Sequence, residues 1–228
     1  MGLRVPVKLK LRWLVSIAII SCIAIYYVPH AFQRPINRIR INARYEHLQP
    51  QEIQQVVIPL INKGFFTVNV AKIQHEVKRL PWVAKVGVRR VWPDTLLITI
   101  KEHKPLAVWK SGGVFDQNNE LFYPTPETIP SGLPILDGPK NLTSKIFKAY
   151  QKLNPIFTSK QLSIHEITVS DRRSWTLILA NNVEVVLGKQ DHIAKVKRLM
   201  SVWDELTATH QTAIRRVDMR YPNGMAVS

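Results

Sequence analysis

The segment from Trp13 to Gln33 constrains this chain more than any other, because it contains no Lys, Arg, Asp or Glu. Its 21 positions would reach about 31 Å as a helix, close to the roughly 30 Å hydrocarbon core of a bilayer. Trp13 begins the segment and Tyr26–Tyr27 lie near its far end, where amphipathic rings favour the headgroup layer. The sequence therefore predicts one transmembrane helix over residues 13–33, preceded by a cytoplasmic head of residues 1–12.

Three other interpretations compete for this segment. A cleavable signal peptide requires small residues at its cleavage site, and Ile25–Pro29 offers none. Ile19–Cys22 resembles a lipobox, but the apolar run continues through Val28, where a cleaved lipoprotein would begin its polar tether. A buried core helix is the third interpretation, and a helix this uniformly apolar behind four cations is unusual in a soluble domain. The pattern favours a membrane anchor.

The formal net charge is +16, and half of it flanks the apolar segment. Residues 1–44 contain eight Lys and Arg and no acid, with four of these cations on each side of the segment. In residues 45–228, 24 basic side chains are interspersed with 16 acidic ones, as on a solvated surface. A nucleic-acid interface would require one contiguous basic face, so this distribution disfavours that class.

The orientation in the membrane follows from length, because the flanking charges are balanced. A 12-residue head is too short to fold and is expected to stay inside, whereas a large following region crosses largely regardless of its charge. The lone cysteine, Cys22, lies inside the apolar segment, so the rest of the chain suits an oxidising compartment. We expect the C-terminal mass to face a periplasm or an extracellular space.

The first part of this outer region predicts the order β-α-α-β-β. Pro59 must kink or end the first helix, Asn69 is an N-cap candidate for the second, and Trp92-Pro93-Asp94 predicts a turn between two strands. The predicted elements are a strand over Ile36–Ile41, helices over Pro50–Ile61 and Val70–Leu80, and strands over Trp82–Val91 and Thr95–Glu102.

From residue 104 onward, short strands and turns predict a β-rich domain with flanking helices, which makes the fold class α+β. A meander is followed by a Pro-rich connection and by a helix that Asn141 or Thr143 could cap, with an apolar stripe of Ile146, Phe147, Tyr150 and Leu153 on one face. Asn181–Asn182 predicts a two-residue hairpin turn, and Asp191 is the cap candidate of a second helix, with Ile193 in its buried stripe. The predicted strands are Leu106–Trp109, Val114–Asp116, Leu121–Tyr123, Leu162–Ser170, Trp175–Ala180, Val183–Leu187 and Ile214–Tyr221.

The sequence shows no recognisable catalytic set. The seven histidines have no metal-ligand spacing, and His75-Glu76 and His165-Glu166 both lack the second histidine of H-E-x-x-H. G-x-S-x-G, a Walker loop and G-x-G-x-x-G are all absent from the sequence. We therefore expect a protein that is not an enzyme, with no cofactor and no metal, although isolated Ser, His and Asp residues leave an unfamiliar active site open.

The last predicted strand is a candidate binding edge. Val217, Met219 and Tyr221 alternate with Arg216, Asp218 and Arg220, and a strand at the end of a chain is often a sheet edge that can accept a partner strand. Tyr221 could equally cap the core of its own domain.

The run Leu80-Pro81-Trp82-Val83, Val88 to Asp94 and Glu102 to Trp109 resembles the FtsQ/DivIB family of bacterial cell-division proteins. The resemblance covers essentially the whole chain. It implies a POTRA domain over residues 34–103, which carries the motif Arg89, Arg90, Trp92, Pro93 and Asp94, and an FtsQ-type β domain over residues 104–228. Sequences of this family commonly continue past the position of Ser228 with another aromatic residue, so either the present sequence is shortened or its edge is incomplete.

The resemblance also implies a function. A protein of this family is a scaffold of the divisome in the bacterial inner membrane at the septum. It binds FtsB, which comes with FtsL, and it connects upstream division proteins to septal peptidoglycan synthesis by FtsW and FtsI. The implied partner-binding residues are Arg220, Tyr221, Asn223, Gly224, Met225 and Val227, with Tyr221 as the aromatic anchor and Arg220 paired with an acidic partner residue. The alternatives are a POTRA-bearing membrane assembly or secretion component and a membrane-anchored cell-wall enzyme.

Overall fold

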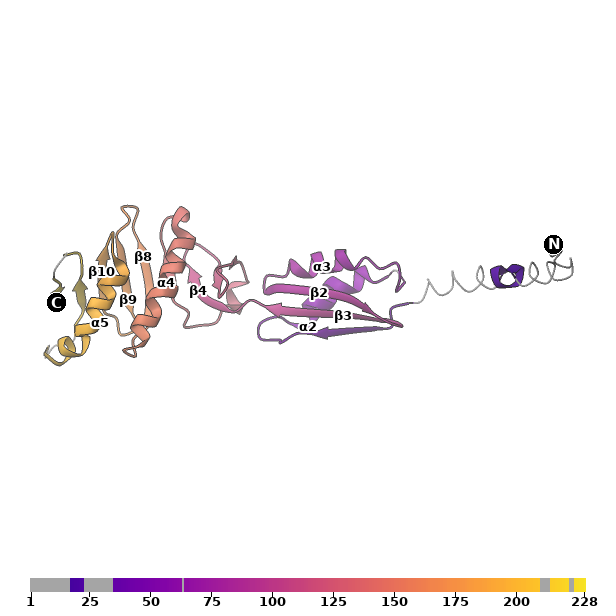
Figure 1. The fold of residues 1–228 in the computed structure, drawn as a ribbon, viewed down its shortest axis with the longest axis horizontal. Helices are drawn as coiled ribbons and strands as arrows, with labels where there is room; N and C mark the ends of the chain where they lie inside the picture. Colours follow the sequence, from indigo (N-terminus) through magenta and orange to yellow (C-terminus); the bar gives the residue numbers. More distant parts are fainter. Residues whose placement is uncertain (1–16, 23–34, 63, 210–213, 222–223) are drawn as a thin grey trace, which may run out of the picture. The chain divides into compact units, whose positions relative to one another are not determined.

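The structure, a computed structural model, describes residues 17–22, 35–62, 64–209, 214–221 and 224–228. The chain divides into two units, Met1–Glu102 and His103–Ser228, which are described in turn (Figure 1). Residues 17–22 are helical and exposed, and the remainder of the predicted span over residues 13–33 lies outside the described residues. Within the described ranges, no helix combines the length and the apolar character needed to cross a bilayer.

The first unit has the predicted β-α-α-β-β order. Its sheet has the strand order β1-β3-β2, with β1 parallel and β2 antiparallel to the central β3. The Asn69 side chain accepts a hydrogen bond from the Lys72 backbone N–H at 2.9 Å, which confirms the predicted cap, and Pro59 lies in a short 3₁₀ turn. The elements are β1 (Arg38–Asn42), α2 (Pro50–Val57), η1 (Ile58–Leu60), α3 (Val70–Lys78), β2 (Val83–Val91) and β3 (Thr95–Glu102).

Two short helices provide one half of the core of this unit, and the central strand provides much of the other. Side chains alternate between the two faces of a strand, so every second residue of β3 points to the same face of the sheet. The buried apolar residues of these three elements are Ile53 and Val57 of α2, Ile73 and Val77 of α3, and Leu96, Ile98 and Ile100 of β3. The opposite face of the same sheet carries the residues between them, among which Thr99 and Lys101 are exposed.

The second unit is built on one nine-stranded sheet with the order β12-β11-β10-β9-β8-β7-β4-β5-β6. The predicted meander is confirmed, because β4, β5 and β6 pair antiparallel in sequence. A second antiparallel group consists of β8, β9 and β10. The strands are β4 (Pro105–Trp109), β5 (Val114–Asp116), β6 (Leu121–Phe122), β7 (Ile135–Asp137), β8 (Ile164–Val169), β9 (Trp175–Leu179), β10 (Glu184–Gly188), β11 (Arg216–Asp218) and β12 (Ala226–Val227).

Strand β7 corrects the prediction of a Pro-rich connection after the meander. It pairs parallel with β4 on one side and parallel with β8 on the other, so it joins the two antiparallel groups into one sheet. Its central side chain, Leu136, is fully buried. A strand of three residues between Pro134 and Gly138 is too short to show an alternating pattern in the sequence, which is why it was not predicted.

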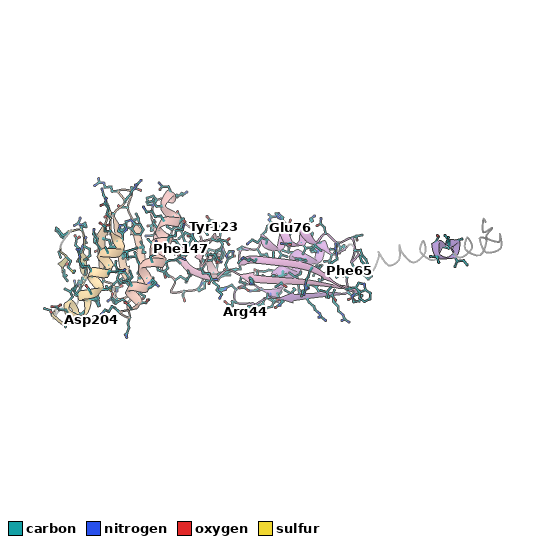
Figure 2. The ribbon with its side chains drawn as sticks, in the orientation of Figure 1. Arg44, Phe65, Glu76, Tyr123, Phe147 and Asp204 are labelled. Carbon is teal, nitrogen blue, oxygen red and sulfur yellow. The ribbon has the colours of Figure 1, made fainter. Side chains whose placement is uncertain are left out.

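The helix α4 (Thr143–Thr158) lies over this sheet and buries the predicted apolar stripe (Figures 1 and 2). Its Phe147 ring stacks on Phe115 of β5 with a centroid distance of 4.4 Å. Neither predicted cap is correct: the 3₁₀ turn η3 (Lys140–Leu142) leads into the helix, and Leu142 occupies the N-cap position without a side-chain hydrogen bond. The preceding turn therefore starts this helix in place of a side-chain cap.

The local geometry also differs from the prediction at both ends of β10. The hairpin before it has three loop residues rather than two, because Leu179 pairs with Val183 and Asn182 has a φ of 64°, as in a type I turn followed by a bulge. After β10, Asp191 precedes α5 (His192–Thr209) with a φ of 59°, whereas an N-cap residue has extended backbone. Ile193 of α5 is 39% exposed and does not belong to the buried stripe, which consists of Val196, Leu199, Met200 and Trp203.

Because β7 bridges the two halves of the sheet, we expect Leu136→Ala to destabilise the second unit by about 3 kcal/mol through loss of apolar contacts and a cavity. Ile135→Ala, at the half-buried preceding position of the same strand, is the matched control and should cost about 1 kcal/mol. Urea unfolding of the full chain, followed by amide exchange in β4 and β8, measures the two values. Equal effects of the two substitutions would contradict the bridging role of Leu136.

Candidate functional site

The C-terminal end of the large sheet is formed by two short strands rather than by one long one. The sequence predicted a strand over Ile214–Tyr221 at the edge, but only Arg216–Asp218 is extended in a ladder, as β11. This strand is interior: it pairs parallel with β10 on one side and antiparallel with β12 on the other. The last strand of the sheet is therefore β12, Ala226–Val227.

The direction of the backbone groups along β12 follows from its pairing. The Ser228 N–H donates to the Arg216 C=O at 3.0 Å, and the Arg216 N–H donates to the Ser228 C=O at 2.9 Å. In an antiparallel ladder, hydrogen-bonded and non-hydrogen-bonded pairs alternate, so the next pair, Val217 and Val227, does not exchange hydrogen bonds. The N–H and C=O of Val227 consequently point away from β11, toward the open side of the sheet.

The segment between the two strands is tied to α5. The Met219 N–H donates to the Val186 C=O at 2.8 Å, which extends the pairing beyond β11. An Nη2 of Arg198 in α5 donates to the backbone oxygens of Tyr221 and Gly224, each at 3.3 Å. Among the predicted partner-binding residues, Tyr221 is 55% exposed, Gly224 is exposed, and Met225 and Val227 pack partly against the core. Asn223 lies outside the described residues.

Arg220 forms an ion pair within its own chain. Its Nε lies 2.9 and 3.0 Å from the two oxygens of Asp218, and its Nη2 lies 2.6 Å from Oδ2. The Arg220 guanidinium beside Asp218 holds the pKa of that carboxyl below its ordinary value, against the opposing effect of burial. The aliphatic part of Arg220 lies over Gly188, where an added Cβ would come within 3.3 Å of the Arg220 Cγ. The side chain stays 59% exposed, so it is fixed in position with a face toward solvent.

The POTRA-type motif lies in the other unit, at the turn between β2 and β3. Arg90 donates from Nη2 to the Val68 C=O at 2.7 Å, and Asp94 accepts from the Asn37 backbone N–H at 3.1 Å. Arg89 is exposed at the end of β2, Trp92 is 74% exposed in the turn, and Pro93 follows it.

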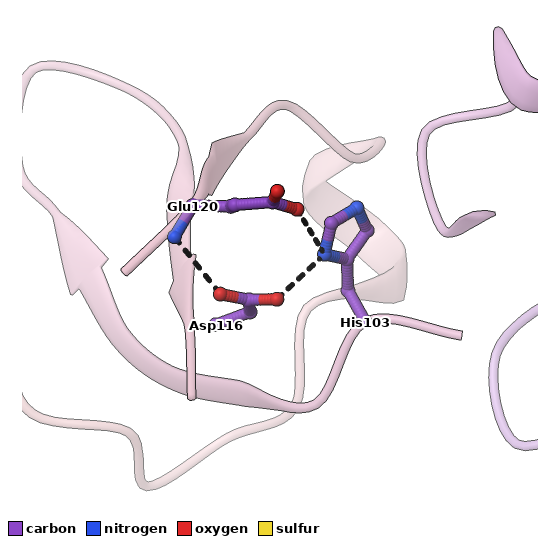
Figure 3. A group of neighbouring side chains, drawn as sticks. All are labelled: His103, Asp116 and Glu120. Carbon is purple, nitrogen blue, oxygen red and sulfur yellow. Dashed lines mark hydrogen bonds and ion pairs between the residues drawn. The ribbon is translucent and has the colours of Figure 1, made fainter. Parts of the chain in front are cut away.

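The structure brings His103, Asp116 and Glu120 together in a cluster (Figure 3). The cluster was not predicted, because the spacing of these three residues in the sequence matches no known metal-binding motif. The His103 Nδ1 lies 3.0 Å from the Asp116 Oδ2 and 4.0 Å from the Glu120 Oε2, so one nitrogen faces both carboxylates. Asp116 is fully buried, and it also accepts hydrogen bonds from the backbone N–H groups of Asn118 and Glu120 and from the Asn118 side chain.

The donors around Asp116 decide what this cluster does. Burial alone would raise the pKa of Asp116, but the hydrogen bonds from His103, Glu120 and Asn118 outweigh it and hold the pKa below its ordinary value. A metal ion at this position would have to displace one of these donors. The geometry therefore fits a buried hydrogen-bonded pair that holds the turn between β5 and β6 against the start of β4, and it does not fit a metal centre.

A groove of about 970 Å³ between α4 and α5 is lined in part by polar side chains. It is lined by Lys145, Lys148, Lys152 and Lys197 together with Ser144, Asp191 and His192. The Ser144 hydroxyl accepts from the Asn119 side chain at 3.1 Å, whereas the His192 Nε2 lies 3.3 Å from the Gly188 C=O. Burial, together with the nearby Lys195 and Lys145, lowers the pKa of His192. These described lining residues make a basic surface and not a set of nucleophile and base in contact.

Comparisons with known proteins agree with this architecture. The family model for the FtsQ-type POTRA domain matches residues 34–103, and the model for the C-terminal region of the cell division protein FtsQ/DivIB matches residues 107–220. The cell division protein FtsQ of Xanthomonas campestris pv. campestris is 32% identical, over 95% of this chain and 79% of that protein. FtsQ of Burkholderia pseudomallei is 31% identical, over 86% of this chain and 81% of the relative. FtsQ of Escherichia coli K12 is 28% identical, over 94% of this chain and 80% of that protein.

The ion pair of Asp218 predicts a pH dependence at this end of the sheet. Because the pKa of Asp218 is lowered on folding, the pair stabilises the folded chain at pH values above the unfolded pKa of about 3.9 and is lost as the pH falls through the lower folded value. We expect the amide protection of residues 216–220, corrected for the intrinsic exchange rate, to be constant from neutral pH down to about pH 5 and to decline below about pH 4.

Two variants separate Asp218 from other acids. Asp218→Asn should remove the decline in amide protection. Glu184→Gln is the control, because Glu184 forms an ion pair with Arg216 at 3.0 Å from the neighbouring strand, and this variant should keep the decline. A decline that persists in Asp218→Asn would show that another group is responsible.

Proposed function

The chain belongs to the FtsQ/DivIB family of cell-division proteins, and from this premise we propose that it is a divisome scaffold that binds FtsB, together with FtsL, by strand addition at β12. The observation that carries the proposal is the position of β12 at the end of the sheet, with the N–H and C=O of Val227 directed outward. A partner strand that pairs with these groups would extend the sheet by one strand, which is a common mode of peptide recognition.

The residues around β12 have the properties that such a partner strand needs. Tyr221 is exposed beside the edge and would be the aromatic anchor, because a tyrosine ring offers a large contact area with few rotatable bonds. Arg220, held by Asp218, would present its exposed face to an acidic residue of the partner. Asn223, Gly224, Met225 and Val227 would supply backbone and small contacts.

The proposed placement in the cell follows from the sequence. Residues 1–12 would be a cytoplasmic head, residues 13–33 a single transmembrane helix in the bacterial inner membrane, residues 34–103 the POTRA domain and residues 104–228 the β domain, both in the periplasm at the septum. The charge-free segment over residues 13–33 supports the anchor. The POTRA domain would respond to upstream division proteins, and FtsB and FtsL would connect the chain to septal peptidoglycan synthesis by FtsW and FtsI.

Substitution of Val227 by proline tests the proposal, because it removes the outward N–H and leaves the hydrogen bonds of Ser228 to β11 in place. We expect the affinity of the full chain for the co-expressed FtsB–FtsL complex to fall at least about tenfold, since a lost ladder bond and the steric bulk of the ring both oppose strand addition. Titration of detergent-solubilised protein measures the dissociation constant.

Val227→Ala is the matched control. It shortens the same side chain but keeps the N–H, so its affinity should stay within about threefold of the original, because the backbone pairing is unchanged. Amide protection in β11 checks that both variants keep the β11–β12 pairing. If Val227→Pro is folded by this criterion and binds as tightly as Val227→Ala, the partner does not add to this edge.

A further inference from the structure

The turn between β2 and β3, hereafter the hairpin tip (Trp92, Pro93 and Asp94), presents an apolar ring to solvent. Trp92 is 74% exposed, the highest value among the large apolar side chains of the described residues. Phe66, in the loop before α3, is 40% exposed, and Arg90 holds Val68, two residues farther along that loop, beside the end of β2. Phe65 precedes Phe66, and Figure 2 shows it at the end of this unit where β1 starts. The exposed Trp92 ring is available for a contact outside the folded unit.

The hairpin tip is fastened to the chain that leads out of the proposed membrane anchor. The backbone N–H groups of Asn37 and Arg38 donate to the Asp94 C=O at 3.1 and 3.4 Å, and the Asn37 side chain donates to the Asp94 carboxylate at 3.2 Å. Only residues 34–36 separate Asn37 from the end of the proposed span at Gln33, so four residue steps join the two. Four residues reach at most about 14 Å in any conformation, so the hairpin tip lies close to the membrane surface if the anchor is inserted.

The exposed face of the small sheet is cationic next to this tip. Register places Arg38 opposite Thr95, and Arg40 opposite Leu97, which in turn lies opposite Arg89 of β2. Residues directly opposite each other point to the same face, so Arg38, Arg40 and Arg89 occupy the two rows nearest to the tip. All three are exposed. The following row, with Asn42, Thr99 and Gly87, is neutral, and the far row carries Lys101 opposite Lys85.

From this arrangement we propose that the hairpin tip and the Arg38, Arg40 and Arg89 side chains form a lipid-binding surface that seats the first unit on the anionic headgroup layer of the membrane. The Trp92 ring enters the interfacial layer, where tryptophan is favoured. The three guanidinium groups contact phosphate oxygens, while their aliphatic stems cover the half-buried Leu97 and Val91. This contact adds a second attachment point to the anchor and restricts the rotation of the unit about the chain at residues 34–37.

The chemistry of the surface favours lipid over a protein partner. An exposed indole and arginine side chains lie only a few residues from the end of the proposed membrane span. Interfacial anchors have this composition, because they combine an amphipathic ring with cations. The proposal rests on the membrane anchor of the proposed function. It is independent of the edge at β12, which belongs to the other unit.

Fluorine NMR of the full chain tests this inference without altering the surface. The chain is labelled with 5-fluorotryptophan and placed in nanodiscs of phosphatidylethanolamine and phosphatidylglycerol that contain a lipid with a nitroxide on its headgroup. We expect stronger paramagnetic relaxation at Trp92 than at Trp82, which is 4% exposed in the same unit. Each resonance is assigned with a Trp→Phe variant.

Charge reversal at the two ends of one face provides the matched comparison. Arg38→Glu with Arg40→Glu should reduce the population in contact with phosphatidylglycerol at least about tenfold, since cations near an anionic surface act additively. Lys85→Glu with Lys101→Glu makes the same change of charge in the far row and should leave the paramagnetic relaxation of the Trp92 resonance unchanged. Equal losses in the two double variants would overturn the assignment to the hairpin tip.

The remaining outcomes separate this inference from the anchor. Trp13, at the start of the proposed span, reports insertion through relaxation by a nitroxide on the acyl chain. Relaxation at Trp13 with none above the Trp82 level at Trp92 overturns the lipid-binding surface and leaves the anchor standing. Relaxation at Trp92 without any at Trp13 supports the surface and contradicts the anchor, and loss of both contradicts the two together.

Discussion

An open β-sheet has two edges, and the backbone groups along each edge must be satisfied by water or by another chain. In the second unit the two ends of the nine-stranded sheet are β6 and β12, each only two residues long. The β6 end is fixed by the buried Asp116, which accepts hydrogen bonds across the turn between β5 and β6. The β12 end is reached only because β11 inserts parallel to β10, so the binding edge that we propose depends on this one pairing.

The contacts around β12 hold it in one arrangement before any partner arrives. Arg198 of α5 bridges the backbone oxygens of Tyr221 and Gly224, and Asp218 fixes the Arg220 side chain over Gly188. A surface that is already ordered loses little conformational entropy when it binds, which favours affinity for a given number of contacts. A single lost ladder bond at Val227 can therefore be decisive although the edge is short.

The sequence predicted most of the architecture where elements are long and strongly patterned, as in the β-α-α-β-β unit and the stripe of α4. It failed where tertiary pairing, and not local pattern, decides the structure. Strands β7 and β11 have three residues each, and each is held in the sheet by its pairing with a strand on either side. The prediction placed the edge of the sheet at Ile214–Tyr221, but β11 is interior and β12 is the last strand, which only the order of the strands reveals. The His103–Asp116 pair likewise depends on the register of β4 and β5.

The measurement that tests the central claim most directly is photo-crosslinking in dividing cells from a photoreactive amino acid at Tyr221. Tyr123 is the control, since it is 66% exposed and follows β6 at the opposite end of the same sheet. We predict that the probe at Tyr221 captures FtsB and that the probe at Tyr123 does not. Capture of FtsB at Tyr123 and not at Tyr221, in cells that divide normally, would contradict the assignment of the binding edge to β12.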